Sequence, residues 1–556
     1  MARKFTRAPP RTSAGRASPS PDMTDLLVIG AGHNGLVCAC YAAAAGLSVR
    51  IVERREVVGG AAVTEEFAPG FRNSTASYTV SLLNPKVIRD LDLYTNGLKI
   101  VERDISNFWP LGTKSGEYLK LTFDEARNIE EFARHSKKDA DALPRYSEAI
   151  GKAADVLRAL VLDIPPNLGG GPRDFFRALM TGGRLSRLKL AEQRLILDLF
   201  TKSAAEFLKG YFEHPAIIGA FAFDGIVGAY ASPETPGTAY VLLHHAFGEV
   251  NGKKGRWGHA IGGMGAISEA MKRVAEARGV EITTSAPVAE VIVENGRAAG
   301  VKLENGEVVR ARAVAANVDP KRLLTKLVGA GALGADMRKR MENYACGSGT
   351  FRMNVALSEL PEFSCLPGKE AAEHHRSGII IGPSVHYLDR AYLDARTYGW
   401  SREPVVEMLL PSTMDDSLAP PGKHVASLFC QHFAPELSDG RNWDLCRNDA
   451  AESIVETVTR YAPNFRASII ARQIHSPLDL ERKFGLTGGD IMHGRLSLDQ
   501  MFSLRPQAGH GDYRMPVKGL YLCGAGAHPG GGVTGAPGHN AAKVIIEDSR
   551  RRRIPA

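Results

Sequence analysis

The sequence predicts an α/β protein in which a Rossmann-like domain is assembled from separated segments and carries an inserted α+β substrate or cap domain. Three observations lead to this fold class. A glycine-rich turn joins a strand to a helix at residues 25–65, a helix precedes two hairpin signals at 255–317, and a second glycine-rich turn lies at 519–548. Such β-α-β units build parallel sheets that bind dinucleotides.

The first block begins with an apolar run at residues 26–29, short enough for a buried parallel strand. Glycines follow it in the G-x-G-x-x-G spacing that opens a nucleotide-binding helix. We expect this helix to reach about Ala45, Gly46 to end it, and residues 49–52 to form the next strand. The spaced glycines are Gly30, Gly32 and Gly35.

Each glycine of this turn has its own predicted role. Gly30 permits the tight turn, Gly32 lets the backbone approach a pyrophosphate, and Gly35 lets the helix pack on the strand. The helix N-terminus adds free N–H groups and partial positive charge. Glu53 lies about 20 residues beyond the glycines, where an acid can accept hydrogen bonds from a ribose diol.

Two alternatives to a nucleotide site exist for this block. Gly329, Gly331 and Gly334 repeat the spacing, but they follow a helical pattern and are interpreted as an interhelical loop. Residues 26–49 also lack charged side chains and are long enough for a membrane span. Three glycines and Asn34 argue against a span, because an opened backbone would lack partners in lipid. A purely structural β-α-β unit remains the other interpretation.

The net charge of +8 lies in the two ends of the chain. Five arginines and lysines precede residue 17, and residues 550–553 are all arginine, so the body is close to neutral. A nucleic-acid footprint would be a basic face of a domain, so no nucleic-acid partner is expected. Residues 1–22 and 550–556 are predicted to be basic tails.

The N-terminal tail leaves the compartment open between two interpretations. It is rich in Arg, Ser and Pro and has no apolar core, so it is not a secretory signal. In one interpretation the tail is a transit segment that directs the protein to the mitochondrial matrix. In the other, translation starts at Met23, the tail is not part of the protein, and the protein is cytoplasmic in a bacterium. Seven dispersed cysteines without C-x-x-C spacing indicate reduced thiols and no metal site.

Residues 73–250 have mainly helical patterns and no second dinucleotide fingerprint. Basic and apolar side chains interleave between Arg173 and Leu195, which is typical either of a solvated helix face or of an interfacial helix on anionic lipid. Peripheral membrane contact is therefore one of the expected partnerships. His244 and His245 end an apolar run, as core histidines or as lining of a substrate cavity.

The middle block combines helical spacing at 264–274 with a strand at 280–282. Asn295-Gly296 and Asn305-Gly306 are type I′ turn dipeptides. They predict a three-stranded meander with strands at 288–293, 297–303 and 308–315. Residues 331–495 are predicted to form a second insertion, in which no catalytic dyad is recognised. A buried strand at 520–523 then leads to a helix from about Thr534.

These three blocks resemble the phytoene desaturase and amine oxidase group of flavoproteins. The matching segments are GAGHNGLV, ERR, VVGGAAVTEEF, GGMGA and GLYLCGAGAHPGGGV. The resemblance implies FAD, with Gly59 and Gly60 along the pyrophosphate and ribityl chain and the strand at Val288 beside the adenine. It implies that the last helix faces the flavin N1 and O2 edge. Many relatives have Asp where this chain has Ala525, which removes that side-chain contact.

The resulting set of cofactor-binding residues is Gly30, Gly32, His33, Asn34, Gly35, Glu53, Arg54, Gly59, Gly60, Ala61, Val288, Gly524, Ala525, Gly532 and Val533. The corresponding domain boundaries are 23–100, 251–330 and 496–549 for the FAD-binding domain, and 101–250 and 331–495 for the inserted domain.

The preferred hypothesis is an FAD-dependent oxidoreductase that moves a hydride between an apolar, isoprenoid-like or polyene-like substrate and flavin N5. One alternative is an amine oxidase with an aromatic pair over the flavin, for which Trp257 is the one candidate, although it could equally be a core residue. The other is a flavin-stabilised interaction protein with little turnover. The electron acceptor would be oxygen, a quinone or a protein partner. His528 is the one speculative catalytic side chain, and capping of the glycine loop is its alternative role.

Overall fold

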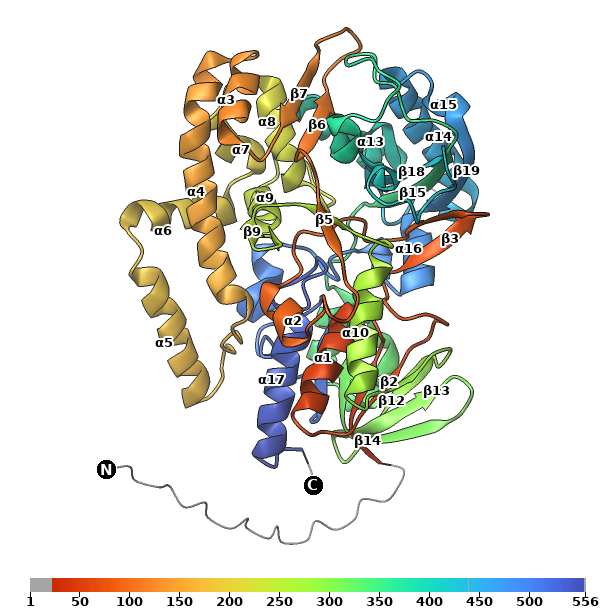
Figure 1. Cartoon of the computed structure of the whole chain (residues 1–556). Coiled ribbons are helices and arrows are strands. Elements are labelled where there is room, and N and C mark those ends of the chain that lie inside the picture. The colour runs from red at the N-terminus through yellow and green to blue at the C-terminus, as the bar shows by residue number, and fades with distance from the viewer. Residues whose placement is uncertain (1–22, 439, 555–556) are drawn as a thin grey trace, which may run out of the picture.

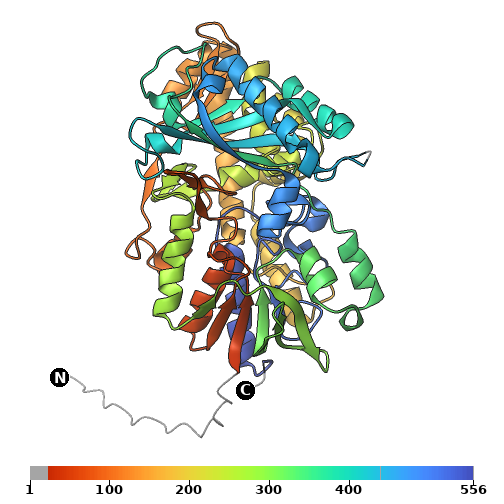
Figure 2. The ribbon, with the colours of Figure 1, turned by 90° about the vertical axis from the view of Figure 1, so that its right-hand side faces the viewer.

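The computed structural model describes residues 23–438 and 440–554. The predicted N-terminal tail and the last two residues of the C-terminal tail lie outside the described residues. Figure 1 shows two stacked regions, with α17 (Ala536–Arg550) in the lower one and α14 (Trp443–Tyr461) in the upper one. The view in Figure 2 shows a separate sheet in each region. The α/β fold class is thereby confirmed.

The lower sheet joins strands from all three sequence blocks. Its order is β11-β2-β1-β14-β13-β12, and β20 pairs with β14. The parallel pairs align Leu26 with Ala313 and Val314 with Leu520. Its strands are β1 Thr24–Ile29, β2 Val49–Val52, β11 Glu281–Thr283, β12 Val288–Glu294, β13 Arg297–Leu303, β14 Val308–Ala316 and β20 Leu520–Leu522. Because carboxyl ends of parallel strands share one edge, distant loops meet there.

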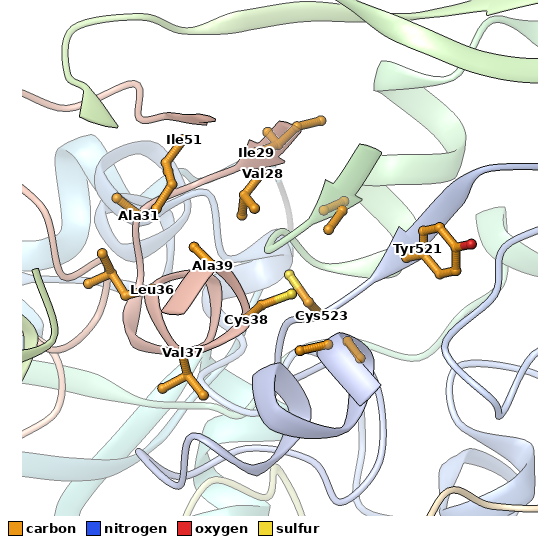
Figure 3. Packing of buried hydrophobic residues seen from close by; sticks show 14 of the residues in the cluster. Val28, Ile29, Ala31, Leu36, Val37, Cys38, Ala39, Ile51, Tyr521 and Cys523 are labelled. Atoms are coloured by element: carbon orange, nitrogen blue, oxygen red, sulfur yellow. The ribbon is translucent and has the colours of Figure 1, made fainter. Parts of the chain in front are cut away.

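Helices α1 (His33–Ala44), α10 (Gly265–Ala277) and α17 (Ala536–Arg550) pack beside this sheet (Figure 1). Leu26, Leu27 and Val28 of β1 are fully buried, as the apolar run predicted. Figure 3 shows the core between α1 and β20, where Cys38 and Cys523 point toward one another. The closeness of α1 to the strands depends on Gly35, since a Cβ there would lie 2.2 Å from the carbonyl oxygen of Gly30.

The meander strands form as predicted, but only one of the two turns does. Asn295 and Gly296 both have positive φ, at 50° and 72°, as a type I′ turn requires. At the second turn only Gly306 has positive φ, and the Asn305 side chain accepts a hydrogen bond from the Glu307 N–H. The type I′ prediction for this second turn is wrong, because the asparagine side chain closes the turn itself.

The upper sheet has the order β19-β15-β18-β17-β16-β6-β7. Its strands are β6 Asn107–Pro110, β7 Tyr118–Leu121, β15 Phe351–Leu357, β16 Gly378–Ile381, β17 Trp400–Leu409, β18 His424–Phe433 and β19 Ile469–His475. The prediction that residues 73–250 are mainly helical missed β6 and β7. These strands have four residues each, and β6 pairs with β16 more than 250 positions later, so no local period reveals them.

Helices cover the upper sheet and the side of the molecule. They are α3 Glu125–Ala133, α4 Lys137–Val161, α5 Pro172–Ser186, α6 Leu190–Thr201, α7 Ala204–Lys209, α8 Pro215–Ala222, α9 Thr238–Ala246, α13 Val385–Tyr398, α14 Trp443–Tyr461 and α16 Pro477–Phe484. In the described chain no helix is long and apolar enough to cross a membrane.

Shorter elements connect the two regions and flank the sheets. These are α2 Pro85–Asp90, α11 Pro320–Arg322, α12 Ala335–Glu342, α15 Phe465–Ser468, β3 Thr64–Ala68, β4 Phe71–Ser74, β5 Ile100–Glu102, β8 Glu249–Val250, β9 Lys253–Lys254 and β10 Gly258–Ala260. Gly329 to Gly334 lie between the helical turn after α11 and α12, so the interhelical-loop interpretation of the second glycine triplet is confirmed.

Candidate functional site

A cleft of about 410 Å³ opens at the carboxyl edge of the lower sheet, and we call it the dinucleotide cleft. Two glycine turns form its floor, because Gly32 and Gly59 pair as an isolated bridge. Gly60 has φ +57°, and a Cβ there would lie 3.2 Å from the Cα of Gly32. The predicted residues that line the cleft are Gly30, Gly32, His33, Asn34, Glu53, Arg54, Gly60, Ala61, Val288 and Ala525.

The N-terminus of α1 points into this cleft. Gly32 is its N-cap and supplies no side-chain cap, so the first-turn N–H groups have no intrahelical acceptor. With its amide oriented to satisfy its neighbours, Asn317 accepts from Gly32 and Gly35, at 3.2 Å each. The N–H groups of His33 and Asn34 then remain available for an anionic group.

Glu53 occupies the end of β2 as predicted and is 6% exposed. Its carboxylate accepts hydrogen bonds from the N–H of Ala31 at 2.7 Å and the N–H of Arg55 at 2.9 Å. These bonds hold the carboxylate at the wall of the cleft, where its remaining lone pairs can accept from a ribose.

Unpaired positive charge collects at the cleft. Arg54 and Arg322 both line it, and within the described ranges neither forms an ion pair. Burial and then the neighbouring charge of Arg322 lower the pKa of Arg54. Two guanidinium groups that repel each other in one cleft fit a diphosphate, whose charge would offset both.

A second cavity of about 250 Å³ adjoins the dinucleotide cleft, and we call it the ring cavity. The two share His33, Ala61, His493 and Ala525. His33 Nε2 and His493 Nδ1 are buried without a hydrogen-bond partner among the described residues. A bound group at the junction can satisfy these atoms, so the residues present fit a ligand that spans both cavities.

Most of the ring-cavity wall is apolar. The apolar residues are Leu82, Trp109, Leu121, Phe221, Phe223, Val227, Met264, Ile267, Phe429, Ile491, Met492 and Val533. Trp257 also lines the cavity, and the guanidinium of Arg103 lies 5.5 Å from the centre of its ring. Trp257 therefore lines the cavity.

One end of the ring cavity is a buried polar cluster that consists of Tyr78, Arg103, Arg352 and Glu407. The Tyr78 hydroxyl donates to Glu407 at 2.5 Å, and the guanidinium of Arg352 lies 4.6 Å from the centre of the Tyr78 ring. Arg103 donates to Thr79 at 2.6 Å. Burial raises the pKa of Glu407, against the opposing charge of Arg103. No sequence pattern indicates this cluster, because Tyr78 and Glu407 are 329 positions apart.

Asp224 contributes a second carboxyl to the ring cavity. Its neighbours there include His245 of α9, whose Nδ1 donates to the Val241 carbonyl at 2.8 Å. Burial lowers the pKa of His245. Burial, followed by the charge of Glu407, raises the pKa of Asp224 from 3.8 to about 7. Of the two histidines at the end of α9, His245 thus lines the cavity, as one interpretation of the sequence expected.

Replacement of Asp224 by asparagine should stabilise the protein at high pH only. The folded state holds the Asp224 proton more tightly than the unfolded state, so this carboxyl costs stability progressively as pH rises from 3.8 to about 7. We expect the Asp224→Asn variant to gain up to about 4 kcal/mol in unfolding free energy at pH 8 and almost nothing at pH 4. Urea unfolding at both pH values measures this.

The exposed Asp336, which pairs with Arg340 on the surface of α12, is a matched control. Asp336→Asn should change the unfolding free energy by less than about 0.5 kcal/mol at either pH. An equal effect of Asp224→Asn at pH 4 and pH 8 would show that ionisation of Asp224 does not limit stability.

The remaining predicted residues take different positions. Gly532 and Val533 line the ring cavity, whereas Gly35, Gly59 and Gly524 support the backbone beneath the cleft. His528 lines neither of the two cavities. Its Nε2 contacts the Leu160 carbonyl at 3.0 Å, and its ring stands on Phe502, so the speculative catalytic role has no support from this geometry.

Several cleft residues were missed by sequence reasoning. Asn317 directly follows β14 at the shared carboxyl edge, so its position at a strand end was the available signal. The others come from loops, from α11 and from α16, where no motif marks them. The missed lining residues include Pro287, Glu304, Val318, Arg322, Arg482, Lys483, Phe484 and His493.

A Rossmann-like cleft with a glycine cradle, a ribose-facing acid and an adjoining apolar cavity defines a flavin-dependent oxidoreductase. This chain belongs to the flavin containing amine oxidoreductase family, whose signature matches residues 35–350. FAD is the cofactor, and the chain is an FAD-dependent oxidoreductase.

The resemblance found in the sequence is confirmed by individual relatives. The chain is 41% identical over 550 residues to pyridine nucleotide-disulfide oxidoreductase domain-containing protein 2 of Rattus norvegicus, which covers 94% of this chain and 93% of the relative. It is 26% identical to a limonene dehydrogenase subunit of Castellaniella defragrans, with 94% of each chain covered. It is also 26% identical to a lycopene-forming phytoene desaturase of Pseudescherichia vulneris, with 95% and 100% covered.

Solved structures agree in fold. An oxidoreductase from Methanosarcina mazei gives a TM-score of 0.58 at 17% identity, with 94% of this chain and 100% of that chain covered. Putrescine oxidase bound to putrescine gives 0.58 at 16% identity, with 95% and 99% covered. All seven cysteines of this chain are free, and the sequence has no C-x-x-x-x-C pair.

Proposed function

We propose that this chain dehydrogenates an apolar, isoprenoid-like substrate held in the ring cavity. The observation that supports this proposal is the apolar wall described above, which adjoins the dinucleotide cleft directly. The names of two relatives, a limonene dehydrogenase subunit and a phytoene desaturase, belong to enzymes of isoprenoid compounds and support the same substrate class. When bound, FAD supplies the acceptor for the hydride that the substrate loses.

The protein's own contribution is binding, orientation and exclusion of water. Phe223, Phe429 and Met492 belong to the apolar wall, which orients a hydrocarbon by shape and gives it a site away from water. The Tyr78 hydroxyl donates a hydrogen bond to the Glu407 carboxyl, so neither group needs a polar atom of the substrate as a partner. Loss of a hydride leaves a carbocation, and the double bond forms only when the neighbouring carbon also gives up a proton. Asp224, which lines the same cavity and has its pKa raised to about 7, would accept that proton.

The reduced cofactor would pass its electrons to oxygen, a quinone or a protein partner. This part of the proposal is supported by the single dinucleotide fingerprint, since the second glycine triplet forms an interhelical loop. A nicotinamide nucleotide would need a second cradle of that kind.

Anaerobic mixing of the FAD-loaded protein with substrates tests this function. An isoprenoid hydrocarbon should bleach the visible flavin absorbance, whereas an amine with the same number of carbons should leave it unchanged. Protein that remains colourless after incubation with FAD would contradict the cofactor assignment. If no member of a broad panel of candidate substrates bleaches the flavin absorbance, the interaction protein with little turnover is favoured.

An amine oxidase is the second candidate function, because Asp224 and Glu407 could bind a polar substrate. Arg103 and Arg352 weaken this candidate, since the charges of both guanidinium groups already act on the Glu407 carboxyl. Bleaching by the amine and not by the hydrocarbon, with release of peroxide in air, would support the amine oxidase.

A further inference from the structure

Helices α5 and α6 are joined by a short turn and stand at the edge of the molecule, with α6 at an angle to α5 (Figure 1). We call the two helices together the α5–α6 hairpin. None of the fifteen residues of α5 is buried. Six large hydrophobic side chains of the hairpin are more than half exposed, and we call them the apolar hairpin face. They are Phe175 at 72%, Phe176 at 60%, Leu179 at 61%, Met180 at 51%, Leu190 at 62% and Leu197 at 62%.

Ion pairs, rather than the core, hold α5 in place. Arg173 pairs with Glu547 of α17, and Arg184 pairs with Asp163 at 2.5 Å. These contacts fix both ends of the helix and leave the apolar hairpin face free. Exposing so much apolar surface costs free energy unless another apolar medium covers it.

Basic side chains flank the apolar hairpin face. Arg187, Lys189 and Arg194 are exposed and, in the described parts of the chain, take part in no ion pair. Apolar side chains beside unpaired cations on one amphipathic hairpin are the pattern of a helix that lies in a lipid interface. The negative potential of an anionic leaflet attracts each such cation.

Two neighbouring cavities lie beside the hairpin. A cavity of about 450 Å³ between α4, α5 and α6 shares Val156, Leu160 and Leu185 with a second cavity of about 190 Å³. The second cavity reaches His528 and Pro529, near the flavin-binding C-terminal block.

A second copy of the chain is the competing occupant. In a two-fold symmetric contact the same patch meets itself, so Arg187, Lys189 and Arg194 would gather around one axis. The cores of stable interfaces are depleted in charge, and like charges that face each other across an interface are repulsive. The unpaired cations therefore favour a lipid surface over self-association.

We propose that the α5–α6 hairpin docks this protein on an anionic lipid surface. The apolar hairpin face lies among the acyl chains at the interface, and Arg187, Lys189 and Arg194 contact the headgroup phosphates. This proposal is independent of the proposed function, since it concerns where the protein lies and not what it oxidises.

Flotation of the full-length, FAD-loaded protein with vesicles tests the docking. We expect binding to equimolar phosphatidylcholine and phosphatidylglycerol and at least tenfold weaker binding to phosphatidylcholine alone. Raising the salt from about 0.1 M to about 1 M should weaken binding further, because the Debye length falls from about 10 Å to about 3 Å. The Phe175→Ser/Phe176→Ser and the Arg187→Glu/Lys189→Glu double variants should each bind the mixed vesicles at least tenfold more weakly.

Matched controls lie elsewhere on the surface. Leu445→Ser removes a 78% exposed leucine of α14, and Lys339→Glu reverses an exposed lysine of α12. Both should float like the wild type, and all variants should keep bound FAD and an unchanged melting temperature. Wild-type protein that does not float, or hairpin variants that float as well as the controls, would overturn the proposal. If the wild type is a dimer and only the Phe175→Ser/Phe176→Ser variant is a monomer, the proposal is also overturned, in favour of self-association.

Discussion

Replacement of Gly32 by alanine should remove FAD from the protein and leave its fold intact. Gly32 has φ −67° and ψ 164°, which alanine adopts without strain. Its Cβ would lie 2.7 Å from the Asn317 amide, which accepts a hydrogen bond from the Gly32 N–H, so the added methyl would disturb the turn where the backbone must approach the pyrophosphate. We expect FAD affinity to fall on the order of 100-fold, which corresponds to loss of about 2.8 kcal/mol. Titration of the apoprotein with FAD, followed by flavin absorbance, measures this.

The second glycine triplet provides the control for Gly32. Gly331 has the same place in the spacing, and no atom lies within 4 Å of a Cβ built on it. Gly331→Ala should bind FAD like the wild type, because its loop joins two helices and faces no cleft. Equal affinity in both variants would show that the first glycine triplet does not hold the pyrophosphate.

Replacement of Arg505 by methionine should cost about 4 kcal/mol of unfolding free energy. The side chain is 1% exposed and donates hydrogen bonds only to backbone carbonyls in the described chain. Methionine fills a similar volume but leaves these carbonyls buried without donors. The acceptors are the carbonyls of Met492 at 2.6 Å, Ala525 at 2.9 Å, Gln500 at 3.1 Å, and Gly494 and Arg495 at 3.4 Å.

The Arg505 variant should also lose FAD, because Ala525 lines both cavities and its carbonyl is held by the guanidinium. Urea unfolding and flavin absorbance measure the two effects. Arg340→Met on the exposed surface of α12 should change stability by less than about 0.5 kcal/mol. A loss of unfolding free energy below 1 kcal/mol in Arg505→Met would show that Arg505 does not stabilise the protein through these carbonyls, since each unsatisfied carbonyl alone costs about that much.

The sequence predicted the nucleotide-binding region well because its signals are local. A strand, a turn and a helix within 28 residues fix Gly30, Gly32 and Glu53 relative to one another by steric demands that few residue types meet. The meander was equally predictable, since each strand pairs with its neighbour in the chain. The failed turn prediction at Asn305 shows the limit, because a dipeptide does not determine which group closes a turn.

The inserted region was predicted poorly for the opposite reason. Strands β6 and β7 have four residues each, and their place in the upper sheet depends on β16, which lies far along the chain. His528 lies within the glycine-rich stretch at residues 524–532, and this position alone suggested a catalytic role. The structure turns its ring away from both cavities and onto the Leu160 carbonyl, 368 positions earlier.

By itself, the sequence determined the cofactor cradle, because closely spaced glycines and one acid satisfy backbone geometry and pyrophosphate approach within a single β-α-β unit. Only the tertiary structure decided the ring cavity, where Tyr78 meets Glu407 and Asp224 faces the same space. It also decided that the apolar side of α5 faces outward. The physical reason is that burial and pairing of these side chains depend on how the two sheets and their helices pack, and packing brings together residues that have no relation along the chain.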